Sequence, residues 1–229
     1  MIKYFVGQKG SGKTLQMTKD AQYFFNKGYE IYSNYPLWGY KNISLFKRQK
    51  VIGRFMYSDE FEDKLKTTFD GKKPTLFLLD EAPVLYNSRN WKNFDLDLIY
   101  ALNQSRKTKV HMFMSAQKYD ALDKQMRESA NYVYLCERKL KFIYTVMVVR
   151  PEYFKQDEKD IFLKRYIHRR KLYFKTNLRQ YFKFYDTTHI VLPEKFYIKF
   201  PELFPNPKYF NITNIIENAK RYTEEYVPI

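Results

Sequence analysis

One octapeptide near the amino terminus reads Gly7-Gln8-Lys9-Gly10-Ser11-Gly12-Lys13-Thr14. It fits the phosphate-binding pattern G-x-x-x-x-G-K-[ST] at every defined position. Residues 2–6 before it predict a short buried strand, and residues 13–27 after it predict an amphipathic helix. The glycines let the backbone curl so that its N–H groups and the positive end of the helix face a phosphate group. We call residues 7–14 the P-loop.

The octapeptide assigns roles to its last two residues. Lys13 is expected to reach the β- and γ-phosphates of ATP, and the Thr14 hydroxyl to help hold Mg²⁺. The alternative is a glycine-rich turn that binds nothing. The predicted nucleotide-binding residues are Gly7, Gln8, Lys9, Gly10, Ser11, Gly12, Lys13, Thr14 and Leu15.

The length of 229 residues and a hydrophobic content of 45% suit one α/β domain. Apolar runs predict further strands at 30–34, 54–57, 75–80, 110–115 and 131–136. Helices are expected from residue 58, over 96–107 and over 119–129, and residues 37–53 are expected to form a loop. This alternation of strands and helices predicts a three-layer α/β sandwich.

The character of the sequence changes after residue 137. Residues 138–183 carry 14 basic and 4 acidic side chains, and the runs 140–149 and 171–185 are aromatic and β-prone. A last helix is expected near 212–223. We therefore expect a P-loop core over 1–137 and a small, basic, β-rich C-terminal region over 138–229, either completing the core or appended to it.

The net charge of +16 and the pI near 9.6 favour contact with nucleic acid or an anionic membrane surface. Lysine enrichment from a biased genome is the alternative. Residues 41–54 and 138–183 are the candidate DNA contacts. A single cysteine, Cys136, suits a reducing compartment and is expected to be buried. The longest apolar run, 142–149, is too short to cross a bilayer, so we expect a soluble or peripheral protein.

Polar residues follow two of the predicted strands. Asp80-Glu81 ends the apolar strand 75–80, at the edge where parallel sheets bind ligands. Asp80 is expected to bind Mg²⁺, and Glu81 to polarise the attacking water. Gln117 follows the next strand and is expected to sense the γ-phosphate. A charge pair at a helix start and an ordinary loop glutamine are the structural alternatives.

Phosphoryl transfer also needs a cation on the transferred group, and in many ATPases this is an arginine of a neighbouring subunit. The candidates are Arg89, Arg106 and Arg127. His111 lies inside an apolar run and is expected to be a core residue with its hydrogen bonds satisfied.

The order of these motifs resembles that of the zonular occludens toxin (Zot) family, which includes assembly ATPases of filamentous phages and is similar to the FtsK–HerA class of DNA-pumping ATPases. The resemblance covers most of residues 1–190. The matching segments are 7–14, 33–37, 80–82, 88–91, 105–106, 115–117, 122–123 with Arg127, and 185–187. Ser105 stands where the family usually has a histidine, and we find no membrane-spanning segment after the ATPase region.

The resemblance implies a RecA-like ATPase core that forms a homo-oligomer such as a hexameric ring and moves viral DNA. It implies that Lys13 and Thr14 bind ATP and Mg²⁺, that Asp80 and Glu81 form the second nucleotide motif, and that Gln117 is the sensor. Arg106, or alternatively Arg127, would be the arginine finger.

The leading hypothesis is an ATPase that drives viral or plasmid DNA into or out of a particle through sequence-independent phosphate contacts. The expected partners are DNA, further copies of the chain, and viral coat or membrane proteins. The expected location is the host cytoplasm, with the inner membrane or the virion as alternatives. Two other functions stay open: a nucleotide-gated scaffold that recruits membrane or coat proteins, and a small nucleotide kinase.

Overall fold

The computed structural model describes residues 1–35, 37–42, 48–52, 54–55, 64, 67–68, 73–84, 86, 104, 107, 109–140, 143–151, 169–174, 181 and 184–185. The predicted helices at 96–107 and 212–223 and the helix from residue 58 lie outside these residues, entirely or for the most part. Among the described residues, no helix combines the length and the hydropathy needed to span a membrane.

Within the described part of the chain, eight strands form one sheet in the order β10-β9-β8-β1-β7-β6-β2-β5. The six strands from β8 to β5 pair in parallel, whereas β9 and β10 add to the β8 edge in antiparallel fashion. The strands are β1 (Ile2–Val6), β2 (Glu30–Ser33), β5 (Arg54–Phe55), β6 (Thr75–Leu79), β7 (Val110–Ala116), β8 (Tyr132–Leu140), β9 (Ile143–Val149) and β10 (Arg169–Phe174). β1 lies between β7 and β8, so the P-loop follows a strand that has a hydrogen-bonded neighbouring strand along each edge.

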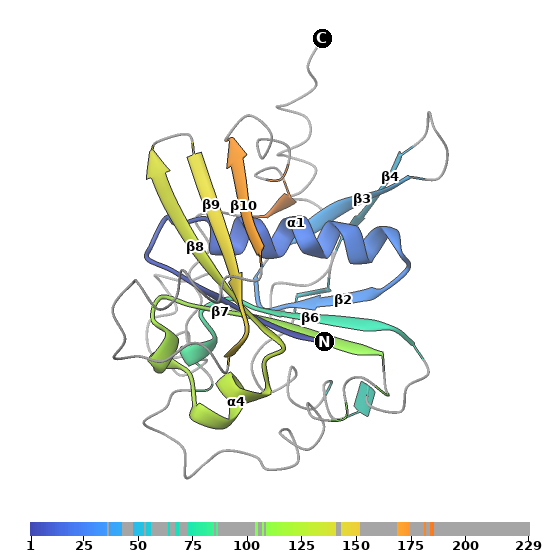
Figure 1. The fold of residues 1–229 in the computed structure, drawn as a ribbon. Helices are drawn as coiled ribbons and strands as arrows, with labels where there is room; N and C mark the ends of the chain where they lie inside the picture. The colour runs from blue at the N-terminus through green and yellow to red at the C-terminus, as the bar shows by residue number, and fades with distance from the viewer. Residues whose placement is uncertain are drawn as a thin grey trace, which may run out of the picture.

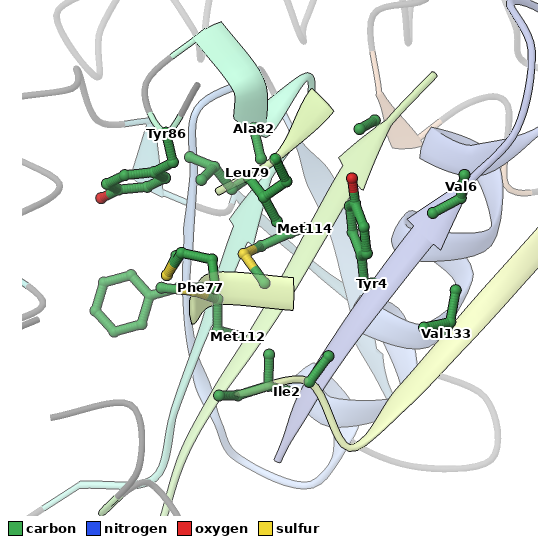
Figure 2. Close-up of a cluster of buried hydrophobic side chains, with 14 of the residues drawn as sticks. Ile2, Tyr4, Val6, Phe77, Leu79, Ala82, Tyr86, Met112, Met114 and Val133 are labelled. Atoms are coloured by element: carbon green, nitrogen blue, oxygen red, sulfur yellow. The ribbon is translucent and has the colours of Figure 1, made fainter. Parts of the chain in front are cut away.

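The two faces of the sheet bury different side chains, because successive residues of a strand point to opposite faces. Figure 1 shows α1 (Lys13–Asn26) across one face and α4 (Lys124–Ser129) beyond the other. On β1, Phe5 packs in the cluster with Leu15, Met17 and Phe24 of α1. Ile2, Tyr4 and Val6 pack in the opposite cluster, which includes Met126 of α4 and is drawn in Figure 2. The predicted three-layer sandwich is confirmed.

The central strands are buried along their whole length. Every residue of β1 and β6 is buried, and six of the seven in β7 are buried. Such unbroken burial is typical of parallel strands that are covered by helices on both faces. It explains why these three strands were predictable from short apolar runs alone.

The prediction of a loop over 37–53 is wrong. This segment contains β3 (Trp38–Asn42) and β4 (Arg48–Ile52), which pair as an antiparallel ribbon separate from the main sheet. The ribbon lies beside α1 (Figure 1). Half of its residues are polar or basic, so the segment lacks the apolar run that predicts the other strands.

The single helix predicted over 119–129 is also wrong, because the chain breaks it in two. A 3₁₀ turn, η3 (Tyr119–Ala121), precedes α4. Leu122 and Asp123 between them are in extended or other non-helical conformations, and Leu122 is fully buried. The Asp123 carboxylate accepts a hydrogen bond from the Gln125 N–H at 2.8 Å and so caps α4.

Further expectations concern individual side chains. Cys136 is buried, as predicted, and burial raises the pKa of its thiol to about 12. Tyr23, by contrast, is 56% exposed although it is one of the large aromatic residues of α1. His111 is partly buried, and its Nε2 shares a hydrogen bond of 3.2 Å with the Tyr29 hydroxyl.

His111 makes the stability of the fold depend on pH. Burial, with smaller contributions from the amino-terminal ammonium group and Lys3, lowers its pKa to about 4. The unfolded chain binds this proton near pH 6.5, so the folded protein loses stability as pH falls through the range from 6.5 to 4. We expect a loss of about 2 kcal/mol between pH 7 and pH 5 that is absent in His111→Gln. Urea denaturation at both pH values measures it, and an unchanged pH slope in the variant would contradict this assignment.

Candidate nucleotide site

The P-loop leaves the carboxyl end of β1 and enters α1 at Lys13. The Gly7 N–H donates to the Ala116 carbonyl of β7 at 3.3 Å, which ties the start of the loop to the neighbouring strand. Gly10 and Gly12 have φ of 75° and 88°, values that favour glycine. Gly12 precedes the first residue of α1, and its carbonyl accepts from the Gln16 N–H at 2.9 Å.

Lys13 folds back over the P-loop. Its ammonium donates to the Gly7 carbonyl at 2.9 Å and to the Gln8 carbonyl at 3.2 Å, and the residue is buried. The charge of Lys13 is therefore concentrated at the centre of the loop, where a bound phosphate would need it.

A chain of hydrogen bonds connects the P-loop with the ends of β6 and β7. The Thr14 hydroxyl donates to Asp80 Oδ2 at 2.9 Å. The other oxygen of this carboxylate, Oδ1, accepts a very short bond from the Ser115 hydroxyl. The Ser115 Oγ in turn accepts from the Glu81 N–H at 3.1 Å. Three separate segments of the chain are thus held at one edge of the sheet.

Glu81 is held in an unusual backbone conformation. Its φ is 46°, a region that costs a residue with a side chain about 1 kcal/mol or more. The hydrogen bond from its N–H to Ser115 supports this conformation, and Gln117 Nε2 donates to Glu81 Oε1 at 3.3 Å. Burial and then the charge of Asp80 raise the pKa of the Glu81 carboxyl, whereas the charge of Lys13 lowers it. The arrangement suits a carboxylate that accepts a proton.

Asn34 fixes the backbone of Asp80 from the other side. It directly follows β2, the strand next to β6. Its side-chain Nδ2 donates to the Asp80 carbonyl at 2.8 Å, and its Oδ1 accepts from the Asp80 N–H at 2.8 Å. Asn34 itself is buried, so the pair of bonds is partly shielded from water.

The structure brings together Lys13, Thr14, Asp80, Glu81 and Gln117, which the sequence predicted as one site. Leu15 packs its side chain into the core cluster beneath α1. The guanidinium carbon of Arg127, on α4, lies 5.0 Å from the centre of the Tyr119 ring. The buried Nε of Arg127 has no hydrogen-bond partner among the described residues. Arg89 and Arg106 lie outside the described residues.

Sequence reasoning gave no role to Ser115 and Asn34. Both are polar residues at the carboxyl ends of the strands that flank β6, namely β7 and β2. Once the strand order is known, a polar side chain at either position indicates a hydrogen-bond partner of Asp80, because both strands lie next to β6. The strand order itself is not visible in the sequence.

The site residues also fit a magnesium ion. The hydroxyl of Thr14 and the carboxylate of Asp80 are hard oxygen ligands within hydrogen-bond distance of each other. The described residues contain no group of three or more His, Cys, Asp or Glu side chains that would form an all-protein metal centre. This composition agrees with Mg²⁺, which keeps several waters and relies on substrate phosphates.

The model of the Zonular occludens toxin (Zot) family matches residues 1–189. The "Gene 1 protein" of Salmonella phage IKe and that of Enterobacteria phage I2-2 are each 28% identical to the chain over 148 residues, which cover 60% of the chain. The match spans 40% of the length of these relatives.

Among solved structures, the N-terminal domain of zonular occludens toxin from Neisseria meningitidis is similar to the chain. The TM-score is 0.53 at 16% identity, over 81% of the chain and 98% of that structure. This likeness concerns the fold, and with the P-loop and the strand order it confirms the predicted RecA-like P-loop NTPase architecture.

The two bonds of Asn34 predict a measurable effect on stability. Asn34→Ala removes both of these partly buried hydrogen bonds to the N–H and carbonyl of Asp80 and should lower the free energy of unfolding by about 2 kcal/mol. The matched control is Asn26→Ala, because the Asn26 side chain at the end of α1 accepts an exposed hydrogen bond from Gln22. Urea denaturation of both variants measures the difference, and equal effects would contradict the assigned role of Asn34.

Proposed function

Because the chain belongs to the zonular occludens toxin (Zot) family, we propose that it is an ATPase that moves DNA during the assembly or packaging of a virus particle. The observation that carries the proposal is the contact between the Thr14 hydroxyl of the P-loop and the Asp80 carboxylate, with Glu81 and Gln117 beside it. A phosphate loop alone would suit many proteins. The adjoining pair of acids suits hydrolysis.

ATP with Mg²⁺ would supply the transferable phosphoryl group and a metal that neutralises its charge. In the proposed site, the backbone N–H groups of residues 8–14 and the Lys13 ammonium bind the phosphates. Lys13 would exchange the carbonyls of Gly7 and Gln8 for phosphate oxygens, which are stronger acceptors because they are charged. Thr14 and Asp80 would hold the metal.

Glu81 is the proposed general base. Its position next to Gln117 would let the amide orient the attacking water while the carboxylate takes its proton. Burial and the neighbouring Asp80 favour proton acceptance, because both raise the pKa of Glu81. The hydrogen bond from the Glu81 N–H to Ser115 would hold Glu81 at the edge of the sheet where the P-loop lies.

DNA is the proposed macromolecular partner. The support is the net charge of +16 and its concentration in residues 138–183, part of which forms β9 and β10. Residues 41–54, which contain most of the β3–β4 ribbon, are the second proposed contact. Binding through Lys and Arg to phosphates would be independent of sequence and would weaken with salt. The two relatives are phage proteins, which supports a role in a virus.

The active form we propose is a homo-oligomer such as a hexameric ring, with nucleotide between subunits and an arginine of the neighbour completing the site. Arg106 and Arg127 are the candidates for that arginine. Viral coat or membrane proteins are further proposed partners, in the host cytoplasm, at the inner membrane or in the virion. Residues 1–137 would form the ATPase core in this scheme, and residues 138–229 the region that contacts the substrate.

ATP hydrolysis by the purified chain tests the proposal. We expect hydrolysis that rises with added single- or double-stranded DNA. Lys13→Ala and Glu81→Gln should each lower it about 100-fold or more, because they remove phosphate binding and the general base. Two matched controls keep the wild-type rate: Lys27→Ala at the far end of α1, and Glu128→Gln on α4, both exposed.

Other results would point to the other functions. ADP that forms only when a nucleoside or nucleoside monophosphate is present would indicate a nucleotide kinase. Nucleotide binding and liposome flotation without any effect of DNA would indicate a membrane or coat scaffold. Either result would overturn the proposed motor.

A further inference from the structure

The β8–β9 pair closes one side of the P-loop. β8 lies next to β1 on the side away from β7 and β6. A Cβ atom on Gly7 would lie 2.2 Å from the Cys136 carbonyl oxygen of β8, and a Cβ atom on Gly12 would lie 2.8 Å from Cδ1 of Tyr144 on β9. Both ends of the loop therefore touch the β8–β9 pair so closely that only glycine fits.

Arg138 of β8 lies next to this contact region. It lies two residues after Cys136 on β8, hence on the same face of the strand, and it pairs across the ladder with Tyr144. Its guanidinium carbon is 5.9 Å from the centre of the Tyr144 ring, which in turn packs on Gly12. The register shifts immediately after Arg138, and such bulges re-aim side chains near binding sites. An exposed cation thus stands beside the P-loop.

The strand order decides which phosphate this cation would meet. Asp80 and Glu81 follow β6, which lies on the opposite side of β1 from β8. If Glu81 activates the attacking water, the γ-phosphate points toward β6 and β7. The β8 side of the loop then receives the α-phosphate and the nucleoside.

We propose that Arg138 is a nucleotide-binding residue that contacts the phosphates nearest the nucleoside, and that Tyr144 positions both Arg138 and Gly12. The proposal rests on the proposed nucleotide binding at the P-loop. It separates Arg138 from the rest of the basic region 138–183, which we assign to DNA. The proposed role also differs from that of an arginine finger, because Arg138 would bind nucleotide in its own chain and would bind ADP as well as ATP.

Titration of the full chain with fluorescent N-methylanthraniloyl derivatives of ADP and ATPγS, at fixed salt, tests this inference. Arg138→Ala should raise the Kd for both nucleotides about tenfold, because it removes a charge-assisted hydrogen bond. Arg138→Lys should lie in between, since the charge stays but the guanidinium fork is lost. Thermal unfolding without nucleotide should give the same Tm for wild type and variants, which shows that they are folded.

The matched control is Arg150→Ala. Arg150 is exposed and follows the end of β9 that runs away from the P-loop, and its loss changes the net charge by the same amount. We expect its Kd values to stay within twofold of wild type. Equal weakening by Arg150→Ala, no weakening by Arg138→Ala, or a loss for ATPγS alone would each overturn the assignment of Arg138. A wild-type chain that binds neither nucleotide would instead overturn the proposed function itself.

Discussion

The hydrogen bond between the Thr14 hydroxyl and the Asp80 carboxylate is the link on which the candidate site depends. It joins the first turn of α1 to the end of β6 through two residues that lie 66 positions apart in the chain. Ser115 of β7 bonds the Asp80 carboxylate and Asn34 after β2 bonds the Asp80 backbone, so four segments meet at this one residue. The remaining groups, Lys13, Glu81 and Gln117, are arranged around this point. A shift of Asp80 would therefore disturb both the metal ligands and the general base of the proposed reaction.

The parallel sheet makes this convergence possible. Parallel strands end at the same edge, so the residues that follow β1, β2, β6 and β7 are brought together whatever their distance in sequence. The antiparallel strands β9 and β10 do not follow this parallel arrangement. Together with β8 they extend the sheet beside the P-loop, and Tyr144 and the Cys136 carbonyl pack on its glycines. The C-terminal strands thus take part in shaping the loop as well as carrying basic residues.

The sequence predicted the elements that are marked by a complete motif or by an unbroken apolar run. The octapeptide 7–14 and the apolar runs of β1, β6 and β7 identified the loop, the central strands and the acids at their ends. Three kinds of feature were out of reach. Half of the residues in the β3–β4 ribbon are polar or basic, and the break at Leu122 and Asp123 depends on burial and a local cap. The roles of Asn34, Ser115 and Arg138 depend on strand order and register, which arise from tertiary packing.

The central claim is that a triphosphate binds between the P-loop and the acids after β6. A crystal structure with Mg²⁺ and a nonhydrolysable ATP analogue tests it most directly. The account predicts that the Lys13 ammonium leaves the carbonyls of Gly7 and Gln8 for the phosphates, and that the terminal phosphate faces Glu81. An analogue bound elsewhere, with Lys13 still on those carbonyls, would contradict it.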